Sequence, residues 1–168
     1  MNEDNNSIVL SWGNIEKIIK KATETIKNNK IPDIILAIQR GGFIPAVMLS
    51  HALNIRDIIP LNIKITTDDS VNSQKIQPIL EYNPDVQKIK GKNVLIVDDI
   101  IGSGRTYQVA LNYLLEYHPA SLRSLICVIN KNNWEKVNDD SPDKIINYIG
   151  MEVRGWVEFP WERNYIHE

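Results

Sequence analysis

Two adjacent acids stand where an apolar run of the chain ends. Asp98 and Asp99 follow Val-Leu-Ile-Val at positions 94–97, a composition that predicts a buried strand. Neighbouring strand residues point to opposite faces of a sheet, so both carboxylates can serve one site only if the chain is leaving the strand there. Paired carboxylates can accept hydrogen bonds from hydroxyl groups and can bind a divalent cation.

A glycine-containing turn comes next. Positions 102–106 read Gly-Ser-Gly-Arg-Thr and lead into a predicted helix. Glycine lets a ligand approach the backbone, and the free N–H groups of a helix start attract anions. The turn is not a Walker A loop, and Tyr107 stands where a full G-x-G-x-x-G would have its third glycine. Acids beside an anion site fit a sugar phosphate; the alternative is a surface turn with solvated acids.

The elements that must position these residues alternate between helices and strands. The expected helices cover residues 12–28, 44–53 and 103–117, and the expected strands cover 34–38, 58–65, 94–97, 122–129 and 144–149. This order predicts an α/β fold with a mainly parallel central sheet flanked by helices, and ligands beyond the carboxyl ends of the strands. Pro60 predicts an edge position or an irregular start for its strand, and the polar residues 66–82 predict a surface loop or a loose hairpin.

Length and composition exclude several classes of protein. The chain has 168 residues, which predicts one domain, and 19 basic against 21 acidic residues give a net charge of −2. We therefore expect no nucleic-acid partner. The apolar runs are too short to cross a membrane, and the polar, acidic start predicts no signal peptide and a cytoplasmic location. Cys127 lies in an apolar run, which favours a buried small side chain over a reactive thiol.

The strand, acid pair and phosphate turn at 94–106 resemble the signature of the type I phosphoribosyltransferases. Residues 39–42 (Gln-Arg-Gly-Gly) are similar to the pyrophosphate loop of the purine members. Residues 66–82 lie where that family has a loop that closes over the site. Residues 156–162 (Trp-Val-Glu-Phe-Pro-Trp-Glu) are similar to the C-terminal segment of the xanthine–guanine and hypoxanthine phosphoribosyltransferases.

The resemblance covers most of residues 11–165 and implies the type I phosphoribosyltransferase-like fold. It implies one domain over residues 1–168, with a small C-terminal hood segment whose base-recognition elements lie mainly in 131–165. The implied reaction transfers ribose 5-phosphate from 5-phosphoribosyl 1-pyrophosphate to a 6-oxopurine (xanthine, guanine or hypoxanthine), with Mg²⁺ as cofactor, in purine salvage. A homodimer or homotetramer is the implied assembly, without membrane association.

The resemblance also assigns roles to single residues. The implied catalytic residues are Asp98, Asp99 and Arg40, and the implied metal ligands are Asp98, Asp99 and Glu162. Phosphate and pyrophosphate would contact Gly41, Gly42, Gly102, Ser103, Gly104, Arg105 and Thr106. Lys131 would hydrogen-bond the 6-oxo group, Trp156 would stack on the purine, and the Val157 backbone would read the ring edge.

One position departs from the family pattern. Gly102 stands where purine-specific members commonly carry an aspartate that contacts the purine imidazole nitrogen. Glycine cannot do this, so water, another side chain or an already ionised base would have to substitute. The alternatives are a non-purine base, or a regulatory protein that senses phosphoribosyl pyrophosphate or a nucleotide without turnover.

Overall fold

The computed structural model describes residues 7–65, 78–81 and 83–163. Its centre is a five-stranded sheet in the order β3-β2-β6-β7-β8, and every neighbouring pair is parallel. The strands are β2 (Ile34–Ile38), β3 (Ile58–Leu61), β6 (Asn93–Ile101), β7 (Ser121–Asn130) and β8 (Tyr148–Val153). The predicted α/β fold with a parallel sheet is confirmed.

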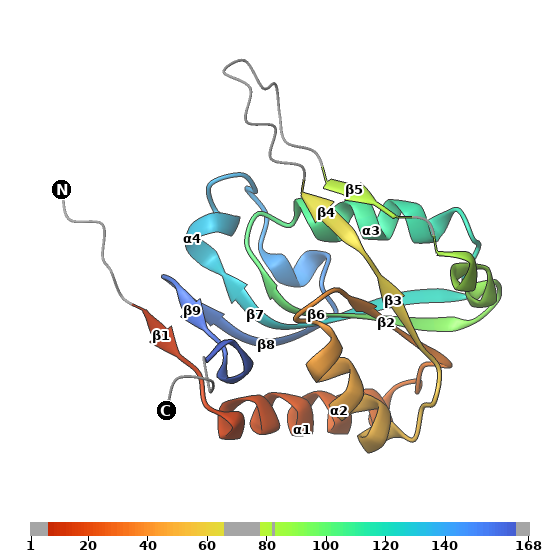
Figure 1. The fold of residues 1–168 in the computed structure, drawn as a ribbon, viewed down its shortest axis with the longest axis horizontal. Helices are drawn as coiled ribbons and strands as arrows, with labels where there is room; N and C mark the ends of the chain where they lie inside the picture. The colour runs from red at the N-terminus through yellow and green to blue at the C-terminus, as the bar shows by residue number, and fades with distance from the viewer. Residues whose placement is uncertain (1–6, 66–77, 82, 164–168) are drawn as a thin grey trace, which may run out of the picture.

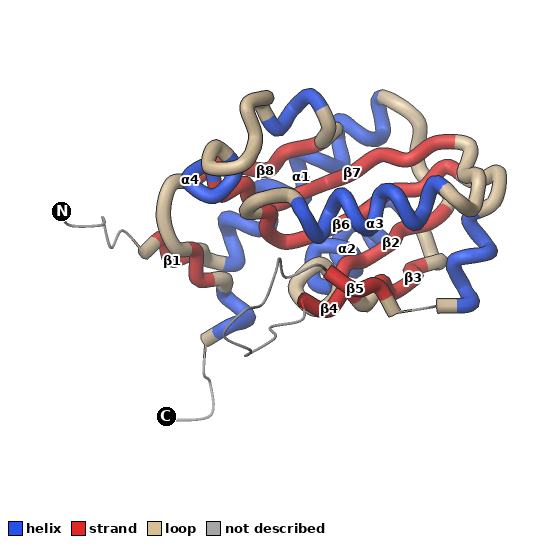
Figure 2. The backbone as a smooth tube through the Cα atoms, turned by 90° about the horizontal axis from the view of Figure 1, so that it is seen from above, coloured by secondary structure: helices blue, strands red, loops and turns tan. Residues whose placement is uncertain are grey.

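Helices cover both faces of this sheet (Figures 1 and 2). On one face lie α1 (Trp12–Asn28) and α2 (Phe43–Leu53), and on the other lies α3 (Arg105–Leu115). Alternate residues of β2 enter the two cores: Ile35 and Ala37 pack with α1 and α2, whereas Leu36 packs on the α3 side. Its continuous apolar sequence therefore reflects burial on both faces.

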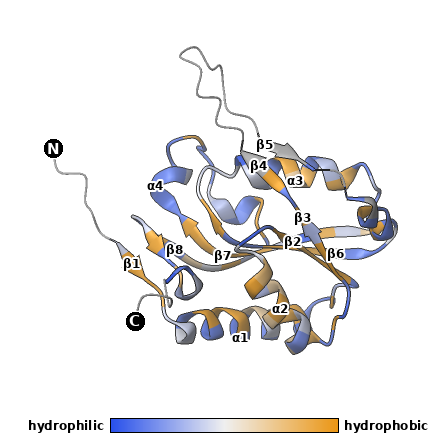
Figure 3. Ribbon diagram, in the orientation of Figure 1, coloured by the Kyte–Doolittle hydropathy of each residue, from blue (hydrophilic) through white to orange (hydrophobic). Residues whose placement is uncertain are grey.

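The two helices of the first face differ in how their apolar residues are distributed. Helix α1 begins where predicted, because the Ser11 side chain accepts a hydrogen bond from the Asn14 backbone and caps the helix. Its apolar stripe faces the sheet and its charged side faces outward, as the colouring in Figure 3 shows. Helix α2 is apolar over most of its circumference, and Val47 remains 43% exposed.

Smaller elements frame the ends of the sheet. They are β1 (Ile8–Val9), β4 (Ile63–Ile65), β5 (Pro78–Leu80), α4 (Lys131–Trp134), β9 (Val157–Glu158) and the 3₁₀ turns η1 (Pro84–Ile89), η2 (Pro142–Lys144) and η3 (Pro160–Glu162). Strand β1 pairs in parallel with β9, which joins the N-terminal segment to the hood segment. Among the described residues, no helix combines the length and apolarity that a bilayer span requires.

The expected strand at 58–65 is wrong, because the chain forms two strands that belong to different sheets. Strand β3 is an edge strand of the main sheet, as Pro60 predicted. Strand β4 leaves that sheet after Asn62 and pairs antiparallel with β5. These are the arms of the hairpin that the polar stretch suggested; residues 66–77 and 82 lie outside the described residues.

Two other boundaries differ from the prediction. Helix α3 begins at Arg105 instead of residue 103, because Gly104 has a φ of +80°, which is left-handed. The expected strand at 144–149 is wrong: Ile146 is buried in the α3-side core within a connecting segment, and the strand β8 starts at Tyr148. Burial alone gives the same apolar pattern in a strand and in a buried connection.

Cys127 is fully buried in β7, as expected. Burial raises the pKa of its thiol, and the negative charges of Asp99 and Asp98 raise it further. A thiol that stays protonated is a poor nucleophile, so the structure supports a packing role for this cysteine.

Candidate active site

A cavity of about 380 Å³ opens at the carboxyl ends of β2 and β6. The strand order reverses between these two strands, because β3 lies on one side of β2 and β6 on the other. Ligands of open α/β sheets bind at such a reversal. The cavity is lined by Ile38, Gln39, Arg40, Gly41, Ile63, Asp98, Asp99, Ile100, Ile101, Gly102, Ser103, Gly104, Arg105, Thr106 and Tyr107.

Both acids of the pair line this cavity. We expected strand β6 to end before these two residues, but it continues through Ile101. Asp98 is only 8% exposed, and its Oδ1 accepts a hydrogen bond from the Asp99 backbone N–H at 3.0 Å. Oδ1 of Asp99 accepts from the Ile100 N–H at 2.8 Å. Each carboxylate is thus held against its own strand while facing one space.

The charges of Asp98 and Asp99 favour a ligand that is positively charged or carries hydroxyl groups. Burial raises the pKa of Asp98 well above its ordinary value, and the neighbouring charge of Asp99 adds to this. Burial likewise raises the pKa of Asp99, and the charge of Glu162 acts in the same direction. Two close carboxylates repel each other when both are ionised, so a bound cation or hydroxyl donor would favour their ionised forms.

The loop after β2 lies directly against the second acid. The peptide bond between Gln39 and Arg40 is cis. A Cβ atom on Gly41 would lie 1.6 Å from Oδ2 and 2.2 Å from Cγ of Asp99, so only glycine leaves room for that carboxylate. Arg40 is exposed at the cavity and supplies a cation beside the acids.

Gly42 has a different environment from its neighbour. A Cβ atom there would lie 2.5 Å from the carbonyl oxygen of Ile38 and 2.6 Å from that of Val97. Gly42 packs between the ends of β2 and β6 and is not among the residues that line the cavity. The structure therefore places the predicted Gly41 and Gly42 in two roles, one at the cavity and one in the packing beneath it.

The predicted phosphate turn forms another part of the cavity lining. Gly102, Ser103, Gly104, Arg105 and Thr106 all line it. Gly104 is the N-cap residue of α3, and no side chain caps this helix start. The first N–H groups of α3 therefore lack the usual side-chain acceptor, which leaves them available to an anion.

Two residues that the sequence analysis missed support this turn from behind. Trp134 is 2% exposed, and a Cβ atom on Gly104 would lie 3.0 Å from its Cζ3 atom. Asn138 donates from Nδ2 to the Ser103 carbonyl at 3.1 Å. The asparagine-rich composition of residues 130–138 could have drawn attention to them, since asparagine side chains often bond to nearby backbone.

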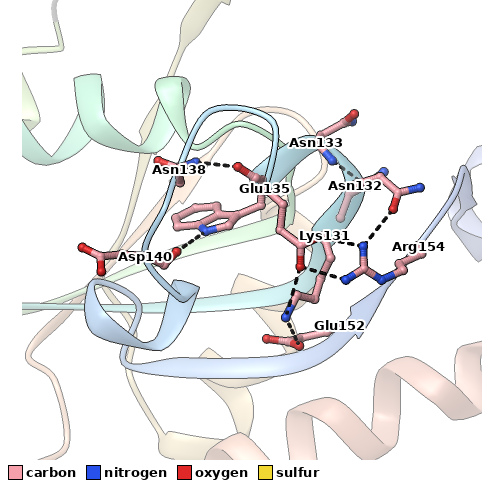
Figure 4. Close-up of polar contacts among 10 residues, drawn as sticks. Lys131, Asn132, Asn133, Glu135, Asn138, Asp140, Glu152 and Arg154 are labelled. Atoms are coloured by element: carbon pink, nitrogen blue, oxygen red, sulfur yellow. Dashed lines mark hydrogen bonds and ion pairs between the residues drawn. The ribbon is translucent and has the colours of Figure 1, made fainter.

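Lys131 begins α4 and takes part in an ion-pair network (Figure 4). Its Nζ lies 3.2 Å from Oε2 of Glu152 and 3.6 Å from Oε1 of Glu135. Arg154 donates two hydrogen bonds to Glu135, at 2.7 and 2.8 Å. These bonds lower the pKa of Glu135. Lys131 is not among the residues that line the cavity, so the structure keeps it beside the acid-pair site and not within it.

The other predicted base-binding residues lie on the hood segment. Trp156 is 75% exposed, which makes it the most exposed of the large apolar side chains described. Val157 is buried, and its strand β9 pairs with β1 at Ile8. Neither residue lines the cavity. Asn130 donates to the Gly155 carbonyl at 2.8 Å and so links the start of α4 to the turn before Trp156.

Glu162 is exposed in η3, and its Oε2 accepts a hydrogen bond from the Phe159 backbone. It is close enough to influence the titration of Asp99. Across the described ranges, no three His, Cys, Asp or Glu side chains gather into a group that could hold a metal ion. The acid pair still fits Mg²⁺, which commonly takes one or two protein carboxylates and completes its coordination with water and substrate phosphates.

A family profile and a curated relative match this chain. The phosphoribosyl transferase domain profile matches residues 5–164. A hypoxanthine phosphoribosyltransferase of Buchnera aphidicola subsp. Schizaphis graminum (strain Sg) is 27% identical over 143 residues, which cover 83% of this chain and 74% of the relative.

Solved structures share the fold over nearly the whole chain. A purine phosphoribosyltransferase from Pyrococcus horikoshii Ot3 superposes with a TM-score of 0.75 and 26% identity, covering 97% of this chain and 99% of that one. A hypothetical protein from Neisseria gonorrhoeae with bound ppGpp superposes with a TM-score of 0.80 and 26% identity, covering 98% and 94%.

Proposed function

The chain belongs to the phosphoribosyl transferase domain family, and on this basis we propose that it is a purine phosphoribosyltransferase of purine salvage. The proposed reaction transfers ribose 5-phosphate from 5-phosphoribosyl 1-pyrophosphate to xanthine, guanine or hypoxanthine, and yields a nucleoside monophosphate and pyrophosphate. One observation carries the proposal: a single cavity at the strand-order reversal joins the acid pair, the Arg40 loop and the uncapped start of α3.

The 5-phosphate is assigned to the turn before α3. An anion there would accept hydrogen bonds from the N–H groups of residues 103–106, and the helix dipole would add to the attraction. Ser103 and Thr106, whose hydroxyl groups can also donate hydrogen bonds, line the same cavity. Trp134 and Asn138 hold the turn from behind, so little ordering is required when the phosphate binds.

The acid pair is assigned to the ribose. Its carboxylates can accept hydrogen bonds from the two ring hydroxyls, and their charge stabilises the positive charge that develops on the sugar as the bond to pyrophosphate breaks. The purine nitrogen then bonds to the sugar carbon, and the electron pair leaves with pyrophosphate. Burial raises the pKa of both carboxyl groups, so a cation or a developing positive charge beside them would favour the ionised form that this role requires.

Pyrophosphate is assigned to Arg40 and the Gly41 backbone, which line the cavity directly beside Asp99. A cationic side chain stabilises the charge that accumulates on the leaving group. Asp98 and Asp99 would hold Mg²⁺; Glu162 is not assigned to the ion, because within the described residues it does not form a metal-binding group with the acid pair. The ion, when bound, neutralises pyrophosphate oxygens and so eases their departure.

The base is assigned to the hood segment, with Lys131 as donor to the 6-oxo group, Trp156 as a stacking surface and the Val157 backbone as reader of the ring edge. The ion pairs with Glu135 and Glu152 orient the Lys131 ammonium and leave donor capacity on it. The exposure of Trp156 suits a ring that awaits a stacking partner. The Buchnera relative is a hypoxanthine phosphoribosyltransferase and the Pyrococcus protein is a purine phosphoribosyltransferase, which supports a purine base.

We further propose a single cytoplasmic domain over residues 1–168 that assembles as a homodimer or homotetramer, without nucleic-acid or membrane partners. The exposed apolar surface supports a subunit contact: Val47 lies on α2, and Trp12 packs against Trp161 near the exposed Trp156 segment. Light scattering coupled to size-exclusion chromatography tests this assembly, and a mass of one chain would contradict it.

A second candidate is a protein that binds phosphoribosyl pyrophosphate or a nucleotide without turnover. Gly102 favours it, because glycine offers no group to the imidazole ring of a purine. The Neisseria structure with bound ppGpp also favours it, since that protein of the same fold holds a phosphorylated purine nucleotide.

One experiment separates the two candidates. The protein is incubated with phosphoribosyl pyrophosphate, Mg²⁺ and one of xanthine, guanine, hypoxanthine, adenine or uracil, and nucleoside monophosphates are measured by chromatography. Product with an oxopurine supports the enzyme. Binding of phosphoribosyl pyrophosphate without product from any base supports the second candidate, and the Asp98→Asn/Asp99→Asn double variant serves as the control for the site.

A further inference from the structure

The space beside Gly102 is filled by a side chain from another element. Gly102 lines the cavity, and a Cβ atom built on it would lie 3.3 Å from Cβ and 3.4 Å from Nδ2 of Asn133. A side chain at position 102 and the amide of Asn133 would therefore compete for one volume. Position 102 has no side chain in this chain, so the neutral amide of Asn133 lies next to the phosphate turn.

The backbone of Asn133 is held in the same unit as the proposed base-binding residues. Asn130 accepts from the Asn133 N–H at 3.3 Å through its side-chain oxygen, and the same side chain donates to Gly155 beside Trp156. The next residue, Trp134, is buried against Gly104. Asn133 is thus fixed between the hood segment and the phosphate turn.

The amide group of Asn133 is free to meet a ligand. The side chain is exposed, and within the described residues it has no hydrogen-bond partner for its amide. In Figure 4 it points away from the ion-pair network around Lys131. Its neighbour Asn132 is turned the other way, and its Oδ1 accepts from Arg154 at 3.2 Å.

We propose that Asn133 recognises the imidazole edge of the bound purine, in the place that Gly102 leaves open. This inference rests on the proposed function. The sugar bonds to one imidazole nitrogen, N9, so the other, N7, is the atom left to be recognised. An amide suits both sides of the reaction: its oxygen accepts from N7–H in the base, and its nitrogen donates to the N7 lone pair in the nucleotide.

The amide positions the base but does not take its proton. As the bond from N9 to the sugar forms and the bond from the sugar to pyrophosphate breaks, the N7 proton passes to water, because an amide is not basic. Asn133 is therefore a specificity-determining residue. The contact depends on N7 itself, so a base with carbon at that position gains nothing from it.

The test compares the binding of GMP with that of 7-deaza-GMP, which has carbon at position 7 and is otherwise identical, by isothermal titration calorimetry. The contact predicts that the wild type binds GMP roughly 5- to 100-fold more tightly than 7-deaza-GMP, the range that one hydrogen bond supplies. Asn133→Ala should weaken the binding of GMP by that factor, and should leave the binding of 7-deaza-GMP and of phosphoribosyl pyrophosphate unchanged. Asn132→Ala, the matched control, should keep the wild-type ratio of the two dissociation constants.

A double variant gives an independent check. Gly102→Asn/Asn133→Gly moves the amide to the other side of the shared volume and should restore the preference for GMP. An unchanged ratio of GMP to 7-deaza-GMP binding in Asn133→Ala overturns the proposal. Turnover tests the proposed function separately: a wild type that binds GMP but turns over no base refutes that function, and the binding ratio still decides the role of Asn133.

Discussion

Two neighbouring glycines should respond to the same substitution in opposite ways. The three atoms nearest to a methyl group on Gly41 all belong to the carboxylate of Asp99, with Oδ2 at 1.6 Å and Cγ at 2.2 Å. A methyl group on Gly42 meets backbone, the carbonyl oxygens of Ile38 at 2.5 Å and of Val97 at 2.6 Å. A side chain can rotate away from an added methyl group, whereas two strand ends cannot separate without loss of packing.

The consequences follow from these distances. In Gly41→Ala the Asp99 carboxylate must retreat by about 2 Å, from 1.6 Å to at least the 3.4 Å of ordinary contact. Misplacement of a catalytic group by about 1 Å can cost roughly 100-fold in rate, so we expect at least that loss. In Gly42→Ala the overlap should cost roughly 3 kcal/mol of stability. For a chain of this length that corresponds to a fall in Tm of roughly 6–12 °C.

Thermal unfolding and steady-state kinetics distinguish the two variants. Gly41→Ala should unfold within about 3 °C of the wild type, the scale of roughly 1 kcal/mol, and lose most of its turnover. Gly42→Ala should show the large Tm loss, and at low temperature the folded fraction should keep its affinity for phosphoribosyl pyrophosphate. Gly41→Ala with wild-type kcat/KM would refute the contact between this loop and Asp99 on which the site depends.

Three further predictions follow from contacts around the cavity. Near pH 8, the free energy of unfolding of Asp98→Asn should exceed that of the wild type by roughly 0.5–2 kcal/mol, although this variant loses turnover. The sign follows from the raised pKa of Asp98: a protein whose carboxyl group has a higher pKa in the folded state loses stability as the pH rises towards that pKa. The gain should vanish in acid, where Asp98 is protonated in both states. A gain that persists in acid would contradict this cause. Asn138→Ala removes the hydrogen bond to the Ser103 carbonyl and should raise the KM for phosphoribosyl pyrophosphate several-fold. Its free energy of unfolding should fall by about 1 kcal/mol. An unchanged KM would show that Asn138 does not hold the phosphate turn in place. Lys131→Met should lower kcat/KM for hypoxanthine relative to adenine by roughly 10- to 100-fold, and an unchanged ratio would remove Lys131 from base selection.

Much of the fold follows from local sequence patterns. The apolar stripe and the Ser11 cap determine α1, and the continuous apolar sequence of β2 indicates burial on both faces. The strand β8 was misplaced because the apolar residue Ile146 is buried outside any strand. The pairing of the two-residue strands β1 and β9, with Ile8 opposite Val157, joins distant parts of the chain. No local sequence pattern predicts such a contact.

The candidate site divides in the same way. The acid pair and the phosphate turn are continuous in sequence, so their composition and order were enough to suggest the chemistry. The contact between Gly41 and Asp99, and the support of the turn by Asn138, arise only when separate strand ends meet. Residue types therefore predicted which side chains gather at the cavity better than which contacts hold the cavity in shape.

The most direct measurement of the central claim is a crystal structure of the protein with guanosine monophosphate and Mg²⁺. The nucleotide should lie in the cavity between β2 and β6, with its phosphate on the N–H groups of residues 103–106 and its ribose hydroxyls within hydrogen-bond distance of Asp98 or Asp99. A nucleotide bound elsewhere, with its phosphate away from this turn and no contact to either acid, would contradict the assignment of the site.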